Sequence, residues 1–206
     1  MQRVVVTRLP VAAAVGTEQT RLNAAVGNMR YPDISGFTIR PITLEDAPAW
    51  AAYICLAEVK RHTSMTVESV DDVRRDIEKS LANKQTAPDR FVIESPQTRQ
   101  LVGTEGFHTI SERHRTAEIS YDVIPSHWGK GIATAACRAA TLWGFEVRGW
   151  HRIQGTTVLA NLASQRVLER CGFQREGLLR NFRMVRGQST DYWLYSAIPG
   201  GIRNAT

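Results

Sequence analysis

The segment from Ala117 to Ala133, AEISYDVIPSHWGKGIA, constrains the fold more than any other part of this chain. Its first half alternates apolar and polar residues, which predicts a strand. Its second half is a loop punctuated by Gly129 and Gly131, whose backbones can approach a ligand closely, and it opens an Ala-rich helix. The first N–H groups of a helix lack intrahelical partners and lie at the positive end of its dipole. A strand leading into such a helix start predicts an anion-binding site.

Composition narrows the remaining choices. With 206 residues, 43% of them hydrophobic, the chain can bury one core, so we expect one globular domain. A net charge of +6 suits either a polyanionic partner or a phosphorylated cofactor. Basic residues neither cluster nor interleave with aromatic residues, so nucleic acid is not the expected partner. No stretch approaches the roughly 20 apolar residues of a membrane span, so we expect a cytoplasmic protein without a membrane partner.

The spacing of the cysteines and histidines does not indicate a metal site. Cys55, Cys137 and Cys171 form no CxxC pair, and reduced, buried thiols are the expectation for a cytosolic protein. The five histidines do not show the i, i+4 spacing of a helical metal site. We therefore expect no metal.

The chain divides into three parts by pattern. Residues 1–35 begin with a basic and small apolar run that Arg8 and Pro10 interrupt, so a signal peptide is not favoured. We expect residues 1–35 to form an N-terminal extension that is flexible or loosely docked. Residues 36–199 are expected to form the domain, and residues 200–206 a C-terminal tail.

Hydrophobic periodicity and turn residues predict mixed helices and strands in the domain. The predicted strands are 37–40, 90–94, 101–110, 117–124 and 152–159, followed by a hairpin over 173–195 that turns at Gly187-Gln188. The predicted helices are Thr43 to about Arg61, one opened by Ser69, about Lys130 to Val147, and Leu162 to Arg170. A three-strand antiparallel meander followed by one βαβ passage indicates an α/β fold with a mixed sheet.

This order of elements, together with two motifs, resembles the GNAT superfamily of N-acetyltransferases. The phosphate loop of that family reads Arg or Gln, two residues, Gly, one residue, then Gly or Ala. Gly131 and Ala133 fill the last two positions, and Trp128 stands where Arg or Gln is usual. The second motif, NLASQRVLERCGF from Asn161 to Phe173, makes the chain similar to the RimJ/RimL-like branch. The resemblance covers roughly residues 36–199.

The resemblance implies a fold and a reaction. The GNAT fold is a mixed, mostly antiparallel central sheet with a splayed pair of strands and helices on both faces. The reaction is acetyl transfer from acetyl-CoA to a primary amine by direct attack in a ternary complex, in a monomer or homodimer. Named members of the branch acetylate protein N-termini, and relatives acetylate small amines. The acceptor is therefore either a protein N-terminus or a polyamine, amino acid or antibiotic amine, and a non-catalytic CoA-binding protein remains an alternative.

The resemblance also implies a set of cofactor-binding residues. In the family, the strand before the phosphate loop bulges and splays from its neighbour, and the pantetheine arm binds in the gap. Backbone groups of Asp122, Val123 and Ile124 are implied for pantetheine. Amides of Gly129, Lys130, Gly131, Ala133 and Thr134 are implied for the pyrophosphate, within a loop that also contains Trp128 and Ile132. Asn161 is implied to contact the cofactor, and its side chain also suits a helix N-cap.

Three residues are the main candidates for catalysis, and a fourth ranks below them. Ser164 matches a family position near the thioester sulfur, where a hydroxyl could protonate the leaving thiolate; its alternative is an ordinary residue in the first turn of a helix. Glu118 is the first candidate base, because a buried carboxylate on a central strand needs either a use or a partner. A paired structural carboxylate is the alternative for Glu118. Glu105 is the second candidate base, and His108 ranks below it.

One family feature is missing from the sequence. In RimL-like enzymes, a carboxylate in the segment before the last strand has been given the role of the base. The corresponding stretch here, Arg180 to Arg183, contains no acid.

Overall fold

The computed structural model describes residues 31–82 and 90–202, which belong to one unit that begins at Tyr31. Residues 1–30 of the expected extension lie outside the described residues. Its last residues do pack on the domain, because Ile34 is 3% exposed and the Tyr31 ring lies 5.7 Å from that of Phe91. The described domain therefore includes residues 31–35.

The expected tail also begins inside the domain. Ile202 packs against the core, and a Cβ added at Gly172 would lie 2.6 Å from the carbonyl oxygen of Gly201. Residues 203–206 lie outside the described residues. None of the helices in the described ranges has the length and apolar character that a membrane crossing requires.

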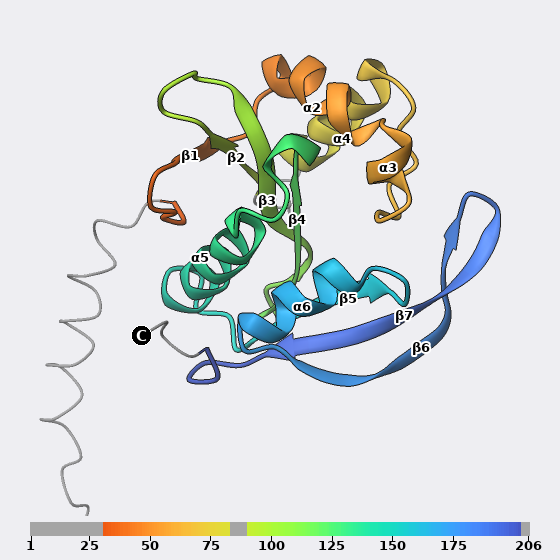
Figure 1. Cartoon of the computed structure of the whole chain (residues 1–206). Coiled ribbons are helices and arrows are strands. Elements are labelled where there is room, and N and C mark those ends of the chain that lie inside the picture. The colour runs from red at the N-terminus through yellow and green to blue at the C-terminus, as the bar shows by residue number, and fades with distance from the viewer. Residues whose placement is uncertain (1–30, 83–89, 203–206) are drawn as a thin grey trace, which may run out of the picture. The chain divides into compact units, whose positions relative to one another are not determined.

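The described strands form one sheet in the order β1-β2-β3-β4-β5-β7-β6 (Figure 1). The strands are β1 (Thr38–Pro41), β2 (Arg90–Glu94), β3 (Leu101–Ser111), β4 (Thr116–Val123), β5 (Arg152–Val158), β6 (Gln174–Val185) and β7 (Gln188–Ala197). Every neighbouring pair is antiparallel except β4 and β5, which are parallel. This arrangement confirms the predicted mixed, mostly antiparallel sheet.

Helices cover both faces of the sheet, and the alternation of β2 shows how. Phe91 points to one face, where its ring lies 5.4 Å from that of Trp143. Val92 points to the other face and joins the core cluster that contains Trp50. Leu168 belongs to the same cluster as Phe91. The first face therefore carries α5 and α6, and the second carries α2 and α4. The bounds are α2 (Ala47–Ile54), α4 (Val70–Ala82), α5 (Ile132–Glu146) and α6 (Leu162–Arg170).

The helix predicted from Thr43 to about Arg61 is wrong as one continuous element. It consists of η1 (Leu44–Asp46), α2 and α3 (Ala57–Lys60), and Leu56 is extended, with φ −65° and ψ 137°. No glycine or proline marks this break in the sequence. Tertiary packing therefore sets it, since Val59 of α3 is buried in the same cluster as α2 and α4.

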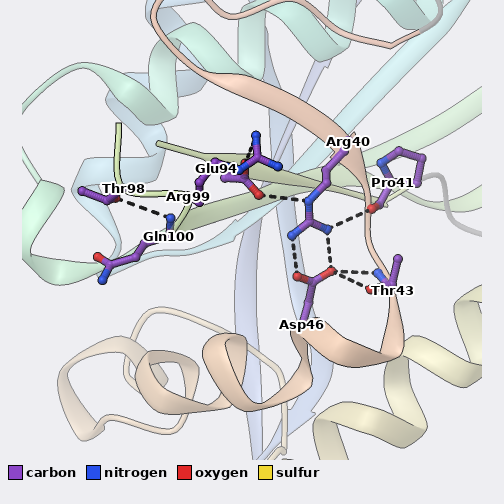
Figure 2. A network of polar contacts seen from close by, with 8 residues as sticks. All are labelled: Arg40, Pro41, Thr43, Asp46, Glu94, Thr98, Arg99 and Gln100. Carbon is purple, nitrogen blue, oxygen red and sulfur yellow. Dashed lines mark hydrogen bonds and ion pairs between the residues drawn. The ribbon is translucent and has the colours of Figure 1, made fainter. Parts of the chain in front are cut away.

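A partly buried ion cluster joins β1, η1 and β2 (Figure 2). The Arg40 guanidinium donates to both oxygens of Asp46, at 2.8 and 2.7 Å, and to Glu94 at 3.1 Å. Asp46 also accepts from the backbone N–H of Thr43, and Arg99 reaches Glu94 at 3.1 Å. Asp46 and Glu94 are only 6% and 3% exposed, so each charge requires its cation. The cluster fixes the α2 region against the sheet edge.

The βαβ passage β4-α5-β5 contains the splay that the family resemblance implies. The two strands pair only where residues 116–118 face residues 152–154, and they separate beyond Glu118. The expected bulge lies elsewhere. The register runs from His108 opposite Glu118 to Ser111 opposite Thr116, so β3 rather than β4 carries the extra residue. Thr109, at φ 53°, takes up the irregularity.

Candidate active site

A cavity of about 920 Å³ opens where β4 and β5 separate. Its volume lies within the range of cofactor and substrate sites. The predicted site residues that line it are Glu118, Asp122, Val123, Trp128, Gly129, Gly131, Ile132, Ala133, Thr134, Asn161 and Ser164. His108 lines it as well, whereas Glu105, Ile124 and Lys130 are not among its lining residues. The fold thus brings most of the predicted residues to one cavity.

The start of α5 forms one end of this cavity. Gly129 and Gly131 have left-handed φ angles of 77° and 81°, which favour glycine. Ala135 makes the bond that closes the first turn, to the carbonyl oxygen of Gly131 at 3.0 Å, so the amides of residues 132–134 lack intrahelical acceptors. A Cβ added at Gly131 would meet nothing within 4 Å, which leaves space for a bound group. The geometry suits a phosphate.

Two arginines that the sequence reading missed strengthen this end. Arg166 and Arg170 lie one turn apart on α6, and both line the cavity. Arg170 also lines a neighbouring pocket together with Gly131 and Thr134. Guanidinium groups bind phosphate oxygens through charge-assisted hydrogen bonds. In the sequence, these two arginines could have been recognised as a pair from their i, i+4 spacing on one predicted helix.

Of the three residues implied to bind pantetheine through their backbone, only Val123 directs its backbone groups toward the gap between β4 and β5. The N–H of Ile124 donates to the carbonyl oxygen of Val102 at 2.9 Å, and bonded pairs alternate along an antiparallel ladder. Asp122 and Ile124 therefore direct their backbone groups toward β3, and Val123 directs its own toward the gap. The indole of Trp128 donates to the Val123 carbonyl oxygen at 2.7 Å, which ties the glycine loop to the strand end.

Asn161 is the N-cap of α6, one of the two roles expected of it. Its Oδ1 accepts the N–H of Ser164 at 3.1 Å. Its Nδ2 donates to the carbonyl oxygen of His62 at 3.1 Å, and the ring of His62 packs edge-on at 6.3 Å from that of Trp128. Both sequence motifs are thereby connected to the segment that follows α3.

The side chain of Ser164 has a partner that the sequence did not reveal. The hydroxyl oxygen of Tyr121 lies 3.0 Å from Ser164 Oγ, and both residues line the cavity. Burial raises the pKa of Tyr121 well above its ordinary value. Strand alternation predicts Tyr121 on the face opposite Glu118. It does not predict the contact with α6, which is distant in the sequence.

Glu118 is a paired carboxylate. Its Oε1 accepts from Thr156 Oγ1 at 2.6 Å and from Arg183 Nη2 at 2.7 Å, and it lies 3.9 Å from His108 Nε2. These contacts all use Oε1. Arg183 comes from the stretch Arg180–Arg183, where the resemblance to RimL-like enzymes would place an acid. In this chain that stretch supplies the cation for an acid on β4.

His108 lies beside Glu118 as a neutral base. Burial lowers the pKa of His108, and Arg90 and Arg183 lower it further, while Glu118 and Asp76 oppose the shift. The imidazole is therefore mostly uncharged near pH 7 and can accept a proton.

Glu105 lies away from the cavity, on the α5 face of the sheet. It is fully buried, opposite Phe91 on one side and Tyr121 on the other. Neither carboxylate oxygen meets a hydrogen-bonding group among the described residues, and burial raises the pKa of Glu105 to about 8. The structure therefore separates the second candidate base from the first.

The wall near Asp122 is a closed polar network. The Asp122 carboxylate accepts from the Tyr53 hydroxyl and from Thr104 Oγ1, the latter at 2.8 Å, and lies 3.8 Å from Arg90. Arg90 also donates to Ser120 at 2.7 Å. The acid in this wall is thus already partnered.

The cysteines lie outside the chemistry of the cavity. Cys137 and Cys171 are 0% and 1% exposed, and neither is among the cavity-lining residues. All three cysteines are free thiols. In the described part of the chain, no group of His, Cys, Asp and Glu residues could hold a metal ion.

Comparisons with known proteins match the chain to one family model and to several relatives. Residues 37–174 match the family described as "Acetyltransferase (GNAT) domain". The chain is 36% identical, over 78% of its length and 92% of the relative, to the uncharacterized N-acetyltransferase YoaA of Bacillus subtilis. It is 25% identical, over 54% of its length and 58% of the relative, to the ribosomal protein uS5-alanine N-acetyltransferase of Escherichia coli.

Two solved structures with bound CoA species share the fold. Mycobacterium smegmatis RimJ in complex with CoA-disulfide is 28% identical, with a TM-score of 0.71 over 82% of this chain and 88% of that one. Vibrio cholerae spermidine N-acetyltransferase in complex with CoA and spermine is 25% identical, with a TM-score of 0.71 over 80% and 96%.

Proposed function

The chain belongs to the GNAT acetyltransferase family, and from that premise we propose that it transfers the acetyl group of acetyl-CoA directly to a primary amine in the cavity between β4 and β5. One observation carries the proposal. The free helix start of α5, the hydroxyl of Ser164 and the carboxylate of Glu118 all border the same cavity at the strand splay. An anion site, an acid and a base are the parts that acyl transfer from a thioester needs.

The cofactor would be held chiefly by backbone and arginines. The amides of residues 132–134 would bind the pyrophosphate, and Arg166 and Arg170 would add charge from α6. The pantetheine arm would lie along Val123 in the gap between the strands. Bound acetyl-CoA supplies an acetyl group that is already activated as a thioester.

The chain's own residues would then manage the protons. The pair Glu118 and His108 would receive the proton of the attacking amine, and Ser164 would give one to the departing thiolate. Glu105 has no part in this scheme, because it does not border the cavity. Cys137 and Cys171 are excluded from it by the same criterion, which supports direct attack without an acyl-enzyme.

The base assignment has its own test. Glu118→Gln should lower kcat/KM by roughly 10²-fold and move its pH profile upward, because the amine must then lose its proton unaided. The Glu118 charge raises the pKa of His108, so its removal should lower that pKa. If the acid limb of the kcat/KM profile of Glu118→Gln moves to lower pH instead, the base is His108.

The charges of the cavity favour an α-amine over a polyamine. Of the three acids that line the cavity, Glu118 is paired with Arg183, and Asp122 with Tyr53, Thr104 and Arg90. The third, Asp76, is outnumbered by the basic residues of the same lining, so a second ammonium group would enter a basic cavity; these residues are Lys79, Arg90, Arg166, Arg170 and Arg183. An α-amine, with an ordinary pKa near 8, also needs little help to lose its proton. We therefore propose a protein or peptide N-terminus as the acceptor, with a small-molecule amine as the alternative.

A panel of amines tests this choice. Thiol release from acetyl-CoA should be faster, as kcat/KM, with peptides bearing a free N-terminus than with spermidine. Arg183→Ala should narrow that preference, because it frees Glu118 to bind a second ammonium group. Arg175→Ala removes an arginine from the same strand, stacked on Trp193 outside the cavity lining, and should leave the preference unchanged.

Three results would contradict these proposals. A preference for spermidine in the unmodified protein would contradict the α-amine acceptor. An equal response to both arginine variants would contradict the charge argument. Binding of CoA without thiol release for any amine would favour the non-catalytic alternative.

A further inference from the structure

Two hydroxyl groups meet in the lining of the cavity. Tyr121 reaches from β4 to the first turn of α6, where its oxygen lies 3.0 Å from Ser164 Oγ and 3.4 Å from the Ser164 carbonyl oxygen. Both side chains line the cavity. Tyr53, another tyrosine of the domain, bonds to Asp122 instead, and Tyr195 bonds to Glu169.

A structural account explains only part of this contact. The neighbours of Tyr121 on its strand face, Ile119 and Val123, are apolar and buried, so a phenylalanine would fill the position without needing a partner. A tyrosine there introduces a hydroxyl that must be satisfied. The hydroxyl that satisfies it belongs to Ser164, the residue at the open cavity.

Proton chemistry gives this pair a use. A serine hydroxyl is a far weaker acid than a phenol, whose ordinary pKa is about 10. Burial raises the pKa of Tyr121, but the same surroundings also disfavour an alkoxide on Ser164, so the phenol remains the stronger acid of the two. If Ser164 alone protonated the leaving thiolate, an alkoxide would remain. A second hydroxyl can pass its own proton to the serine oxygen while the serine proton leaves. The energetic cost of forming an alkoxide on Ser164 is then avoided.

Resting on the acetyl transfer proposed above, we propose that Tyr121 is a positioning residue that orients Ser164 and supplies, through it, the proton taken up by the departing thiolate. The amine nitrogen bonds to the acetyl carbon and the carbon–sulfur bond breaks. The sulfur takes the Ser164 proton, and Ser164 takes the proton of Tyr121. The amine releases one proton during the reaction, and solvent returns a proton to the tyrosinate. The sum is thioester plus amine giving amide plus thiol, with no oxidant or reductant.

Tyr121→Phe tests the relay because it removes one oxygen atom and keeps the ring. We expect kcat for thiol release to fall by roughly 10²-fold, with the KM for acetyl-CoA and the Kd for CoA unchanged within about twofold. Ser164→Ala should act alike. The double variant should be no slower than the slower single variant, because the two hydroxyls act as one unit.

Tyr195→Phe is the matched control. Tyr195 lies on the same sheet and is fully buried, and its hydroxyl bonds to Glu169 at 3.1 Å, away from the cavity lining. This variant should keep the kcat of the unmodified protein. If Tyr121→Phe fails to fold, a fluorinated tyrosine placed at position 121 keeps the hydroxyl and lowers its pKa, and the alkaline limb of the kcat profile should move to lower pH.

Defined outcomes overturn the relay. Unchanged kcat in folded Tyr121→Phe, or losses that multiply in the double variant, would assign the contact to packing alone. An unmoved alkaline limb with the fluorinated residue would do the same. These results differ from a failure of the proposed function, in which the unmodified protein would release no thiol with any amine.

Discussion

At the scale of single residues, Glu105 is the polar group that the fold accommodates least well. It is fully buried, both of its carboxylate oxygens lack partners among the described residues, and burial raises its pKa from 4.5 to about 8. The folded protein therefore holds this carboxyl in its protonated form at neutral pH, whereas the unfolded chain releases the proton. Glu105 thus costs stability in neutral solution.

Replacing Glu105 by Gln should reveal that cost. Between pH 4.5 and about 8 the unfolded state binds fewer protons than the folded state, so the free energy of unfolding falls as pH rises. The slope from this one group is about 1.4 kcal/mol per pH unit. Glu105→Gln removes that slope, so the variant should come within about 1 kcal/mol of the unmodified protein near pH 5 and exceed its stability by a few kcal/mol, as an order of magnitude, near pH 8.

Urea unfolding at the two pH values measures the effect. Glu78→Gln, an exposed change on α4, is the control and should leave the pH dependence as it is. Equal slopes in the unmodified protein and in Glu105→Gln would show that the buried carboxyl is charged or partnered near neutral pH.

Side-chain direction was predictable from sequence at this scale, and side-chain partners were not. Alternation along β4 correctly put Glu118 and Asp122 on one face and Tyr121 on the other. The partner of Glu118, Arg183, is 65 residues away on β6, and that of Tyr121, Ser164, is 43 residues away on α6. Such contacts depend on strand order and register, which periodicity does not specify.

At the scale of elements, the proposal ties the start of α5 most directly to the cofactor. Gly131 is its N-cap, with a left-handed φ of 81°. Gly131→Ala should lose roughly 1 kcal/mol of unfolding free energy, because an L-residue is strained in that region. It should also weaken CoA binding more than tenfold, since the new methyl group enters the space proposed for the pyrophosphate.

Gly149 provides a matched control for that variant. It has a similar φ of 65° and open space around its Cβ position, but it lies between α5 and β5 and does not line the cavity. Gly149→Ala should lose comparable stability and keep its CoA affinity in calorimetric titration. Equal affinities in both variants would move the pyrophosphate away from this helix start.

Elements with local signals were the best predicted. β2 and α6 have the bounds that the sequence indicated, and Asn161 caps α6 as its type suggests. The break at Leu56 and the irregularity at Thr109 were missed because packing and strand pairing cause them. Neither residue type signals a break or a left-handed conformation.

At the scale of the whole molecule, the strand order brings distant motifs to one place. β4 and β5 are neighbours that pair over only three residues each, and the phosphate loop, α6 and the β6 segment with Arg183 all border the resulting cavity. The resemblance to a family predicted the splay, which residue patterns alone did not. The proposed choice of acceptor depends on the charges that line the cavity, and only the structure shows which of them are paired.

The central claim is direct transfer of acetyl from acetyl-CoA to an amine in this cavity. The most direct test is intact-mass spectrometry of protein and acceptor after mixing with stoichiometric acetyl-CoA, first without and then with an N-terminal peptide amine. The account predicts an unmodified protein in both cases, and one acetylated peptide for each thiol released once the amine is present. Acetyl groups on the protein before the amine is added, or no acetylated acceptor from any amine, would contradict it.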